Sequence, residues 1–535
     1  MAAAKRGGLE PPHEAGREGR RGRAWTPPTL AVALASLVML QGFTKAQTVT
    51  PGAAPLQPVP ATALPAPTTG PLAPIPGVPQ APKPVINLRA DQITLLRHAL
   101  DQAETHGFEH DQFAIPGLDD LLQSRDPAQR RAGQDKLIAA ALRYALAVHG
   151  GRLAASDYLY EWGLRPAYYD PEFEFDQAVA QDRLAAWLDS LPPPYTGYDA
   201  LRGALATYRG IAARGGWPTV PDGPDLKPGE HDARVKALRL RLSIEDSAVP
   251  ASGPAVMDPD LVQGLMRAQK RFGLEPNGIL GKQTLAALNT PVSERVDQII
   301  ANMERWRWLP AQLPSDRIQV NIAAAVLTVF HDDTPTLSMR AVTGRPDDET
   351  PMLKSEIHSV VFNPPWNVPT TIAAKELWPK EHAHPGYFAR NDFIVIKNPD
   401  GSTRLQQKAG DKAALGHVKF DFSNKYGVYL HDTPTHGAFG RYARMVSHGC
   451  VRLEHPVVLA KAVFDGDAKW TPDAIDAAID AGDTVRAPLP KPISVFLLYW
   501  TAYVGPDGAA NFRGDPYDWD HELMQRIAAA GRTGA

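Results

Sequence analysis

Apolar residues recur every three or four positions between residues 86 and 241, a spacing that places them on one face of an α-helix. One such face ends at Gly150 and Gly151, and glycine is common where helices end. Its members are Leu137, Ile138, Ala141, Leu142, Ala145 and Val148. We find no grouping of chemically reactive side chains in this region. The pattern therefore predicts a helical scaffold domain over residues 86–245.

A second helical pattern follows in "DPDLVQGLMRAQKRFGLEPNGILGKQTLAALNTPV". It predicts a helix over Asp260–Phe272, a turn at Asn277 and Gly278, and a short helix over Lys282–Asn289. Asn and Gly tolerate the positive φ that tight turns require. We assign residues 246–292 to this unit, which is either a binding module or an ordinary packing unit of two helices.

The pattern changes after a connecting helix expected within residues 293–315. The runs "RIQVNIAAAVLTVF", "LSMRAVTG", "EIHSVVFNP" and "GVYLHDTP" are enriched in β-branched residues, are broken by Gly and Pro, and predict strands. They define a β-rich domain over residues 316–490, followed by a C-terminal extension over residues 491–535. Residues of about 365–424 form an insertion too long for a plain loop, and such insertions usually serve as lids or binding elements.

Length and charge narrow the function classes. A chain of 535 residues is too long for one hydrophobic core, so several domains are expected. The formal net charge is −3, and no basic stretch is long enough to indicate nucleic-acid binding. We therefore expect no nucleic-acid partner.

The N-terminus has the pattern of an export signal. Arginines between residues 17 and 23 precede the apolar run Thr29–Phe43, which is shorter than the roughly 20 apolar residues of a spanning helix. We expect a signal peptide over residues 1–46, cleaved after Ala46, with an uncleaved signal anchor as the alternative. Both place the rest of the chain outside the cytoplasm. Residues 47–85 are rich in Pro and Ala and predict an extended linker.

Cys450 is the only cysteine of the chain and lies in "SHGCVRL". A lone cysteine in an exported chain forms no intramolecular disulfide, so it is either inert or a working thiol. A thiol nucleophile needs a neighbouring imidazole. His431, His436 and His448 lie close to Cys450 in the sequence. The spacing alone does not decide whether His431 or His448 is the base.

Three other interpretations stay open from these residues alone. The first is a zinc site that uses His431, His436, His448 and Cys450, although the paired ligand spacing of zinc motifs is missing. The second is a structural cluster of packed histidines with an inert cysteine. The third is a Cys–His hydrolase of another fold, such as a papain-like amidase, although in those enzymes the Cys precedes the His.

The segment "HDTPTHGAFGRYARMVSHGCVRL" resembles the signature of the L,D-transpeptidase (YkuD) catalytic domain, with a His, about fifteen residues, and then Ser/Thr-His-Gly-Cys. The runs "VNI", "VTGR" and "NPPWNVP" and the tail "VFLLYWTAYVGPDGAANFRGDPYDWD" fit the large subclass of these enzymes. Residues 246–292 resemble a peptidoglycan-binding module. The resemblance implies a multidomain α+β protein, in which an all-α scaffold and a small helical peptidoglycan-binding module precede a β-rich catalytic domain with a capping insertion.

The resemblance also implies catalytic roles. Cys450 is expected to be the nucleophile and His431 the general base and acid. The backbone carbonyl of Asp432 is expected to orient the second ring nitrogen of His431, and His448 becomes a supporting residue. The backbone N–H groups of Gly449 and Cys450 are expected to stabilise the oxyanion.

Further residues are expected around this centre. The Tyr429 hydroxyl is expected to support the oxyanion. Arg452 either pairs with a substrate carboxylate or braces the site. Trp366 and Asn367, where the capping insertion begins, are expected to line the donor pocket, and Ser447 is also expected to contact substrate. The implied chemistry requires no metal and no cofactor.

The implied reaction is the acylation of Cys450 by a tetrapeptide stem, with release of D-Ala, and transfer to the side-chain amine of a diaminopimelate on a second stem. An L,D-carboxypeptidase, a transpeptidase that anchors proteins to peptidoglycan, and a non-catalytic wall-binding protein are the alternatives. The expected partners are peptidoglycan stem peptides and proteins of cell-wall synthesis. The expected location is the periplasm, near or attached to the inner membrane, and carbapenems are expected to acylate Cys450.

Overall fold

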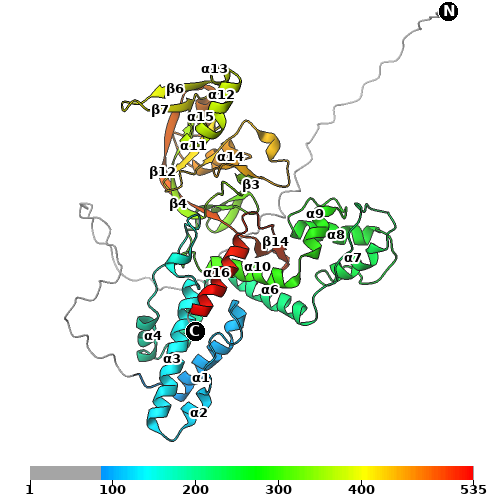
Figure 1. Ribbon diagram of the computed structural model, residues 1–535. Coiled ribbons are helices and arrows are strands. Elements are labelled where there is room, and N and C mark those ends of the chain that lie inside the picture. The colour runs from blue at the N-terminus through cyan, green and yellow to red at the C-terminus, as the bar shows by residue number, and fades with distance from the viewer. Residues whose placement is uncertain (1–85, 534–535) are drawn as a thin grey trace, which may run out of the picture. The chain divides into compact units, whose positions relative to one another are not determined.

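The computed structural model describes residues 86–533. The expected signal peptide over residues 1–46 and the linker over residues 47–85 lie outside the described residues. Helices form the first half of the described chain, and strands dominate from residue 317 onward (Figure 1). Within residues 86–533, no helix combines the length and the apolar character needed to cross a membrane.

The helical half contains α-helices and two short 3₁₀ turns. They are α1 (Ala90–Asp101), η2 (Ala103–His106), α2 (Leu118–Gln123), α3 (Pro127–Gly150), η3 (Ala155–Asp157), α4 (Pro171–Ala180), α5 (Leu184–Ser190), α6 (Thr196–Ala213), α7 (Arg234–Ser243), α8 (Pro259–Arg271), α9 (Lys282–Asn289) and α10 (Val292–Trp306). Asp126, Asp170 and Asp258 cap the N-termini of α3, α4 and α8, each accepting a backbone N–H from the first turn.

Two separate cores stabilise these helices. Helices α1, α3, α4 and α5 enclose one core, in which Leu96, Leu137, Phe175 and Trp187 are buried. Helix α6 and the helices after it share a second, larger core with the strands of the C-terminal half. The region expected to form one scaffold over residues 86–245 therefore divides between two cores.

Helix α10 carries a buried ionic network between these regions. Both Glu304 carboxylate oxygens are used, because Oε1 accepts the Arg152 N–H at 2.6 Å and Oε2 lies 2.7 Å from Arg307 Nη1. Burial by itself raises the pKa of Glu304, but Arg152 and Arg307 outweigh it and lower the pKa below the usual value. Arg307 also donates to the His106 carbonyl oxygen and to the Tyr198 hydroxyl. The buried carboxylate is thus fully paired.

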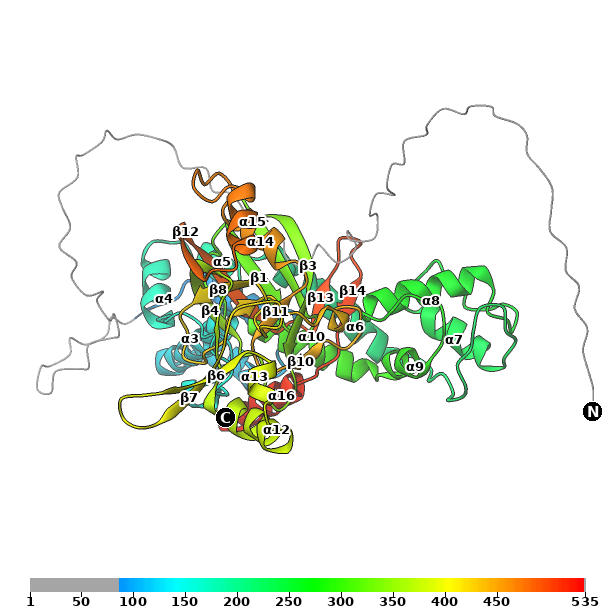
Figure 2. The same ribbon diagram turned by 90° about the horizontal axis from the view of Figure 1, so that it is seen from above.

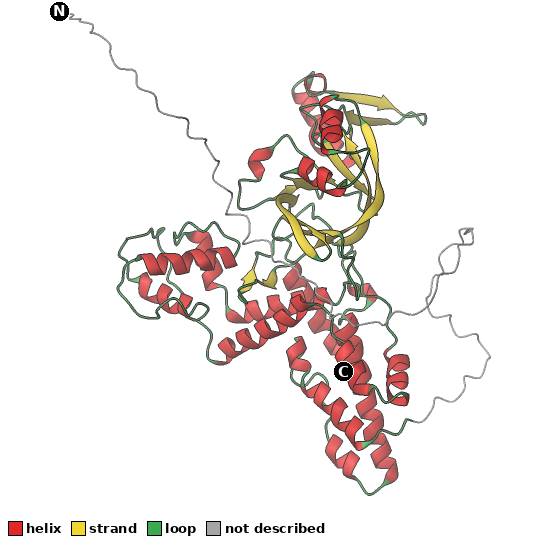
Figure 3. Cartoon of the chain, turned by 180° about the vertical axis from the view of Figure 1, so that it is seen from behind, coloured by secondary structure: helices red, strands yellow, loops and turns green. Residues whose placement is uncertain are grey.

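The main sheet has nine strands in the order β10-β3-β11-β9-β8-β4-β12-β1-β2, and an additional pairing of β2 with β3 closes this order on itself (Figure 3). Its strands are β1 (Arg317–Asn321), β2 (Val326–His331), β3 (Thr334–Gly344), β4 (Leu353–Phe362), β8 (Val418–Phe422), β9 (Leu430–His431), β10 (Met445–Ser447), β11 (Val451–Leu453) and β12 (Val485–Leu498). Between these strands lie η5 (His436–Ala438), α14 (Pro456–Val463) and α15 (Pro472–Asp480).

The sheet corrects two expected boundaries. Strand β12 pairs with β1 and β4 up to Leu498, so the boundary expected at residue 490 falls inside a central strand. This strand contains prolines, and its register shifts between Pro488 and Ile493, where prolines are tolerated in a strand. Strand β8 pairs with β4, so the capping insertion ends before Val418 and not near residue 424.

The capping insertion, hereafter the cap, folds around a core of its own. It contains β5 (Trp366–Asn367), α11 (Thr370–Ile372), the π-helical turn η4 (Ala373–Leu377), α12 (Trp378–Ala383), α13 (Tyr387–Arg390), β6 (Phe393–Lys397) and β7 (Thr403–Gln407) (Figure 2). Its strands form a separate sheet in the order β5-β7-β6. Leu377, Phe388, Phe393 and Leu405 are buried between this sheet and the cap helices.

The chain ends in β13 (Ala502–Val504), β14 (Ala510–Phe512) and α16 (Trp519–Thr533). Helix α16 packs on α10, and Arg305 of α10 forms an ion pair with Asp520. Tyr517, just before α16, reaches the sheet and donates its hydroxyl proton to the Gly344 carbonyl oxygen at 2.6 Å. The C-terminal segment is therefore attached both to the helices and to β3.

Candidate active site

Strand β9 places the signature residues on one face of the sheet. It runs between β8 and β11, with His431 opposite Lys419 on one side and Arg452 on the other. The Val451 N–H donates to the Tyr429 carbonyl oxygen at 3.1 Å, which continues the pairing by one residue. Because alternate residues of a strand share a face, Tyr429 and His431 lie beside Cys450 and Arg452.

Cys450 receives two hydrogen bonds from Tyr429. The Tyr429 backbone N–H and its hydroxyl both donate to Cys450 Sγ. Burial raises the pKa of the Cys450 thiol, while these bonds and the positive charges of Lys419 and Arg452 oppose the rise. Burial, and then the sulfur itself, raise the pKa of Tyr429 far above its usual value. The sulfur is therefore a thiol at rest, in surroundings that stabilise the thiolate.

Lys419 of β8 adds a positive charge near Tyr429 and the Cys450 sulfur. Its Nζ lies 4.3 Å from the centroid of the Tyr429 ring and 2.6 Å from Asp421 Oδ1. A cation over an aromatic face is attracted to the ring. Lys419 is therefore held beside the ring whose hydroxyl contacts the sulfur.

His431 is buried, and its ring is oriented by the main chain. Its Nδ1 donates to the Asp432 carbonyl oxygen at 2.5 Å, which leaves the Nε2 lone pair free to accept a proton. Burial, together with the charges of Arg452 and Lys419, lowers the pKa of His431 to about 3. The imidazole is therefore neutral near pH 7. The structure records no hydrogen bond between His431 and Cys450.

The Asp432 side chain fixes the loop that follows His431. Its Oδ2 accepts the His417 N–H at 2.8 Å, and its Oδ1 accepts the Thr433 N–H at 2.7 Å. A Cβ at Gly416, which has φ +56°, would lie 2.3 Å from the Asp432 carboxylate. The close approach of these two segments therefore requires glycine at position 416.

The turn before Cys450 is braced from inside. The Ser447 hydroxyl donates to the Cys450 carbonyl oxygen at 2.6 Å and accepts the Gly449 N–H at 3.2 Å. Gly449 has φ +101°, a conformation that favours glycine. Of the two N–H groups expected to stabilise the oxyanion, that of Gly449 is thus already bonded, whereas that of Cys450 makes no hydrogen bond within the described chain. Ser447 is buried, and its hydroxyl is bonded within the turn.

Two of the expected residues, Trp366 and His448, lie in contacts between the cap and the site, and a third, Asn367, does not. The Trp366 indole N–H donates to the Tyr429 hydroxyl oxygen, so Trp366 contacts both the cap core and the site. Asn367 is exposed, and its Oδ1 accepts bonds from Arg404 and Gln406 of β7. His448 Nε2 lies 2.6 Å from Glu376 Oε1 on η4.

Arg452 differs from the other cations of the molecule's interior. Its guanidinium makes no hydrogen bond or ion pair with any described residue, and the Cys450 sulfur is the group that favours its charge. Burial lowers the pKa of Arg452. The side chain therefore offers a full set of donors to a negatively charged group on the catalytic face.

Several residues around the site were not predicted from the sequence. Lys419 and Glu376 lie far from the signature in sequence, and no local pattern marks either of them. Thr350 was not among the expected site residues, yet its hydroxyl donates to the Gly449 carbonyl oxygen at 2.7 Å and accepts the Gly344 N–H at 2.8 Å. The Tyr517 hydroxyl accepts the Thr350 N–H at 3.3 Å. These contacts connect the C-terminal segment to the nucleophile turn.

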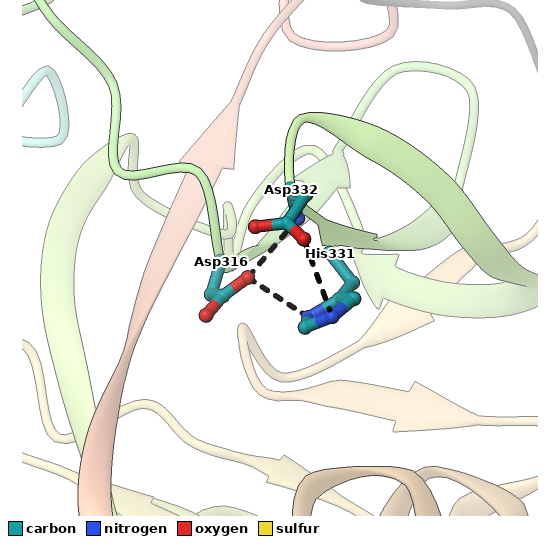
Figure 4. Close-up of side chains that lie close together, drawn as sticks. All are labelled: Asp316, His331 and Asp332. Carbon is teal, nitrogen blue, oxygen red and sulfur yellow. Dashed lines mark hydrogen bonds and ion pairs between the residues drawn. The ribbon is translucent and has the colours of Figure 1, made fainter.

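Side chains of the types that bind metal ions lie close together at a place away from Cys450. The side chains of Asp316, His331 and Asp332 lie close together where β1 begins and β2 ends (Figure 4). His331 Nδ1 lies 3.0 Å from Asp316, and these side chains are largely exposed. His436 lies in η5, its ring 6.1 Å from that of Phe439. Within the described residues, the His431–Cys450 segment does not form such a cluster.

Comparison with known proteins agrees with this geometry. Residues 315–472 match the family model of the YkuD L,D-transpeptidase catalytic domain, residues 84–205 match a scaffold domain, and residues 231–288 match a domain described as "Putative peptidoglycan binding domain". A Haemophilus influenzae protein described as "Putative L,D-transpeptidase" is 30% identical over 265 residues, which cover 46% of this chain and 53% of that protein. The chain thus spans about half the length of the curated relative it matches.

Solved structures with similar segments are also L,D-transpeptidases. One from Mycobacterium smegmatis is 19% identical, with 34% of this chain and 58% of that chain covered and a TM-score of 0.18. One from Xylanimonas cellulosilytica is 15% identical, with 52% and 98% covered and a TM-score of 0.19. The family models confirm the expected multidomain α+β organisation and the resemblance drawn from the signature. Residues 315–472 are thus similar to the L,D-transpeptidase catalytic domain family, and the helical regions before them are similar to a scaffold domain and to a peptidoglycan-binding domain.

Proposed function

We propose that this protein is a peptidoglycan L,D-transpeptidase in which Cys450 is the nucleophile. The observation that carries the proposal is the arrangement of the sulfur. Cys450 Sγ accepts two hydrogen bonds from Tyr429, beside a neutral His431 whose Nε2 is free because Nδ1 is bonded to the Asp432 carbonyl oxygen. This is the combination that thiol-based acyl transfer requires.

In the acylation half, His431 Nε2 takes the thiol proton and Cys450 Sγ attacks the carbonyl carbon of the bond that precedes the terminal D-Ala of a tetrapeptide stem. The oxyanion that forms is stabilised by the Cys450 N–H and the Tyr429 hydroxyl. The C–N bond then breaks, His431 returns the proton to the departing amine, and a thioester remains on Cys450.

In the transfer half, the side-chain amine of a diaminopimelate on a second stem attacks the thioester carbon. His431 accepts the amine proton, the C–S bond breaks, and the proton returns to the sulfur. A new amide cross-links the stems. Water in place of the amine gives the carboxypeptidase product, and a cap that excludes water favours transfer.

The electrostatics suit a pair that ionises only during reaction. Burial favours the neutral forms of both Cys450 and His431. A negative sulfur or oxyanion beside the imidazole opposes the effect of burial on His431 and stabilises the imidazolium. The ion pair therefore forms only during the reaction, as negative charge develops on the sulfur or the oxyanion beside the imidazole.

The unpaired guanidinium of Arg452 supports a substrate-binding role over a bracing role. A stem that ends in D-Ala carries a carboxylate next to the scissile bond, and a charge-assisted pair with Arg452 would orient that bond over the sulfur. We expect Arg452→Gln to raise KM for the tetrapeptide about tenfold, since a hydrogen bond to a charged group contributes about 1.5–3 kcal/mol. Steady-state kinetics of D-Ala release measure this. An unchanged KM would indicate that Arg452 stabilises the site and does not bind the substrate carboxylate.

Mass spectrometry of muropeptides tests the function. Protein lacking residues 1–46 is incubated with disaccharide-tetrapeptide, beside the Cys450→Ala variant. Loss of D-Ala and a new cross-linked dimer, both absent with the variant, are expected, and fragmentation assigns the bond. Tripeptide without dimer would indicate the carboxypeptidase, and no product from either protein would favour a wall-binding role in the cell envelope. An added acceptor protein distinguishes the anchoring transpeptidase.

A further inference from the structure

We propose that Glu376 is a positioning residue that ties the cap to the nucleophile turn through His448, and that this tie controls access to Cys450. Its consequence for product choice rests on the proposed transpeptidase function. The contact itself does not, because it is a hydrogen bond between the cap and the main domain. Glu376 and His448 are separated by 72 positions in the sequence.

The contact is direct and short. His448 Nε2 lies 2.6 Å from Glu376 Oε1, and both side chains are about two-thirds buried, at 27% and 34% exposure. A carboxylate accepting from an imidazole N–H is a charge-assisted bond, which is stronger than a bond between neutral groups. The bond joins the cap to a residue two positions before the sulfur.

Arg345 adds a second attachment at the same point. Its backbone N–H donates to the Ser447 carbonyl oxygen at 3.0 Å, and its guanidinium lies 3.8 Å from Glu376 Oε1. The Arg345 guanidinium also pairs with Asp348 at 2.5 Å. Glu376 therefore faces two groups that are both fixed to the turn leading to Cys450.

The cap presents Glu376 from an unusual element. Turn η4 is π-helical, and its buried residues Ala373 and Leu377 anchor it in the cap core. Single π-helical turns are rare and often occur at functional sites. Because the turn is anchored on one side and bonded to His448 on the other, motion of the cap as a unit must break the Glu376–His448 bond.

A second contact between cap and site, from Trp366 to Tyr429, lies at the entry to the insertion. Glu376 lies within the insertion, ten positions farther along the chain. The cap is therefore attached to the site at two separate points of the insertion. A cap held only by Trp366 is free to move away from the nucleophile turn.

The only cysteine of the chain gives a readout that does not depend on catalysis. Alkylation of the full exported chain by iodoacetamide, a small reagent, reports thiol reactivity, and alkylation by a maleimide carrying a bulky polymer reports access. We expect Glu376→Ala to raise the rate of alkylation by the bulky reagent about tenfold. This factor corresponds to the loss of one charge-assisted hydrogen bond of roughly 1.4 kcal/mol. The small-reagent rate is expected to stay within about threefold.

Two variants make the test specific. Glu376→Gln keeps an oxygen that accepts from His448 and is expected to restore most of the protection. Lys375→Ala alters the exposed neighbour on the same turn and is expected to match the wild type. Because His448→Ala removes the same Glu376–His448 bond, the effect of the double variant with Glu376→Ala is expected to be clearly smaller than the sum of the two single effects.

Four outcomes would contradict the proposed role of the Glu376–His448 bond. In Glu376→Ala, these are an unchanged rate of alkylation by the bulky reagent, or equal changes in the rates with both reagents. In the other variants, they are a Glu376→Gln rate equal to that of Glu376→Ala, or additive effects of the two substitutions in the double variant. Thermal unfolding of each variant identifies a folding defect, and hydrogen exchange of residues 366–413 then reports cap opening in variants that remain folded.

The catalytic consequence is measured separately. In Glu376→Ala we expect the ratio of cross-linked dimer to hydrolysed tripeptide to fall about fivefold, while donor consumption changes less than threefold, because water reaches the thioester. If the wild type forms no product, the proposed function fails while the alkylation result still stands. A normal product ratio with tenfold faster bulky-reagent labelling would refute the link between the tie and product choice.

Discussion

The buried network around Glu304 and the catalytic face around Cys450 treat charge in opposite ways. Glu304 has a partner on each carboxylate oxygen, and one of these partners, Arg307, bonds in turn to His106 and Tyr198. Around Cys450, the Arg452 guanidinium has no partner among residues 86–533, and the neutral His431 keeps a free lone pair on Nε2. Paired buried charge holds helices in place, whereas unpaired groups are free to bind or to exchange protons.

The largest effect is expected when the Cys450 sulfur is replaced. Cys450→Ser leaves the packing of the site nearly unchanged but replaces the thiol with a far weaker nucleophile. We expect acyl transfer to fall by at least about 10³-fold, with Tm within about 2 °C of the wild type. Product formation and calorimetry measure the two quantities. A large loss of Tm would mean that the catalytic face also supports the fold.

The opposite result is expected at Glu304. Glu304→Ala leaves Arg152 and Arg307 buried without a counter-charge, which costs about 3–5 kcal/mol of unfolding free energy. Iodoacetamide labelling of Cys450 should be unchanged in the folded variant. Glu294→Ala, an exposed position on the same helix, is the matched control and should change stability by less than about 0.5 kcal/mol. Equal effects of the two substitutions would contradict the assigned role of the network.

Acid should weaken both regions through their buried histidines. Burial and nearby arginines lower the pKa of His106 to about 3, and His431 has the same value. Between that value and the unfolded pKa of about 6.5, the unfolded chain binds more protons, so unfolding free energy falls as pH falls, by at most about 1.4 kcal/mol per pH unit for each histidine.

Denaturant unfolding between pH 7 and pH 4 measures this slope. His106→Gln and His431→Gln should each reduce it, and the exposed His331→Gln should not. A slope that none of the three substitutions changes would assign acid sensitivity to the carboxylates instead.

The smallest expected effect concerns the Tyr429 hydroxyl. Tyr429→Phe removes one of the two hydrogen bonds to the sulfur and keeps the ring under Lys419. We expect the thiol pKa to rise by about one unit and labelling by iodoacetamide at pH 7 to slow about tenfold. The pH dependence of labelling measures the pKa directly. An unchanged profile would leave the backbone N–H of Tyr429 as the effective donor.

The sequence predicted whether each region is helical or β-rich more accurately than it predicted the residues at which each region begins and ends. The helical spacing of Leu137 and Val148 and the run Lys282–Asn289 correspond to α3 and α9 in the structure. The limits at residues 424 and 490 were wrong, because β8 is a short run flanked by insertion sequence and β12 contains prolines. Neither strand can be recognised without its pairing partner.

In the candidate site, too, residues within a local motif could be predicted from the sequence, and residues brought in by tertiary packing could not. Cys450 and His431 stand in one signature, so the sequence singled them out, and their roles stay predictions until variants are assayed. Lys419 and Glu376 reach the site through strand register and cap packing, which depend on residues distant in the sequence. The substrate contact expected of Ser447 stays a prediction, and its bracing of the turn was not foreseen, because a motif residue that braces a turn and one that contacts substrate are alike in sequence.

The contact from Tyr517 to Gly344 and Thr350 has a consequence for the order in which this part of the molecule is completed. Thr350 donates to the Gly449 carbonyl oxygen, and the Tyr517 hydroxyl accepts the Thr350 N–H, so the turn before Cys450 has all of these contacts only after Tyr517 has folded back onto β3. Premature termination upstream of residue 517 would yield a protein with every signature residue and an unsupported thiol.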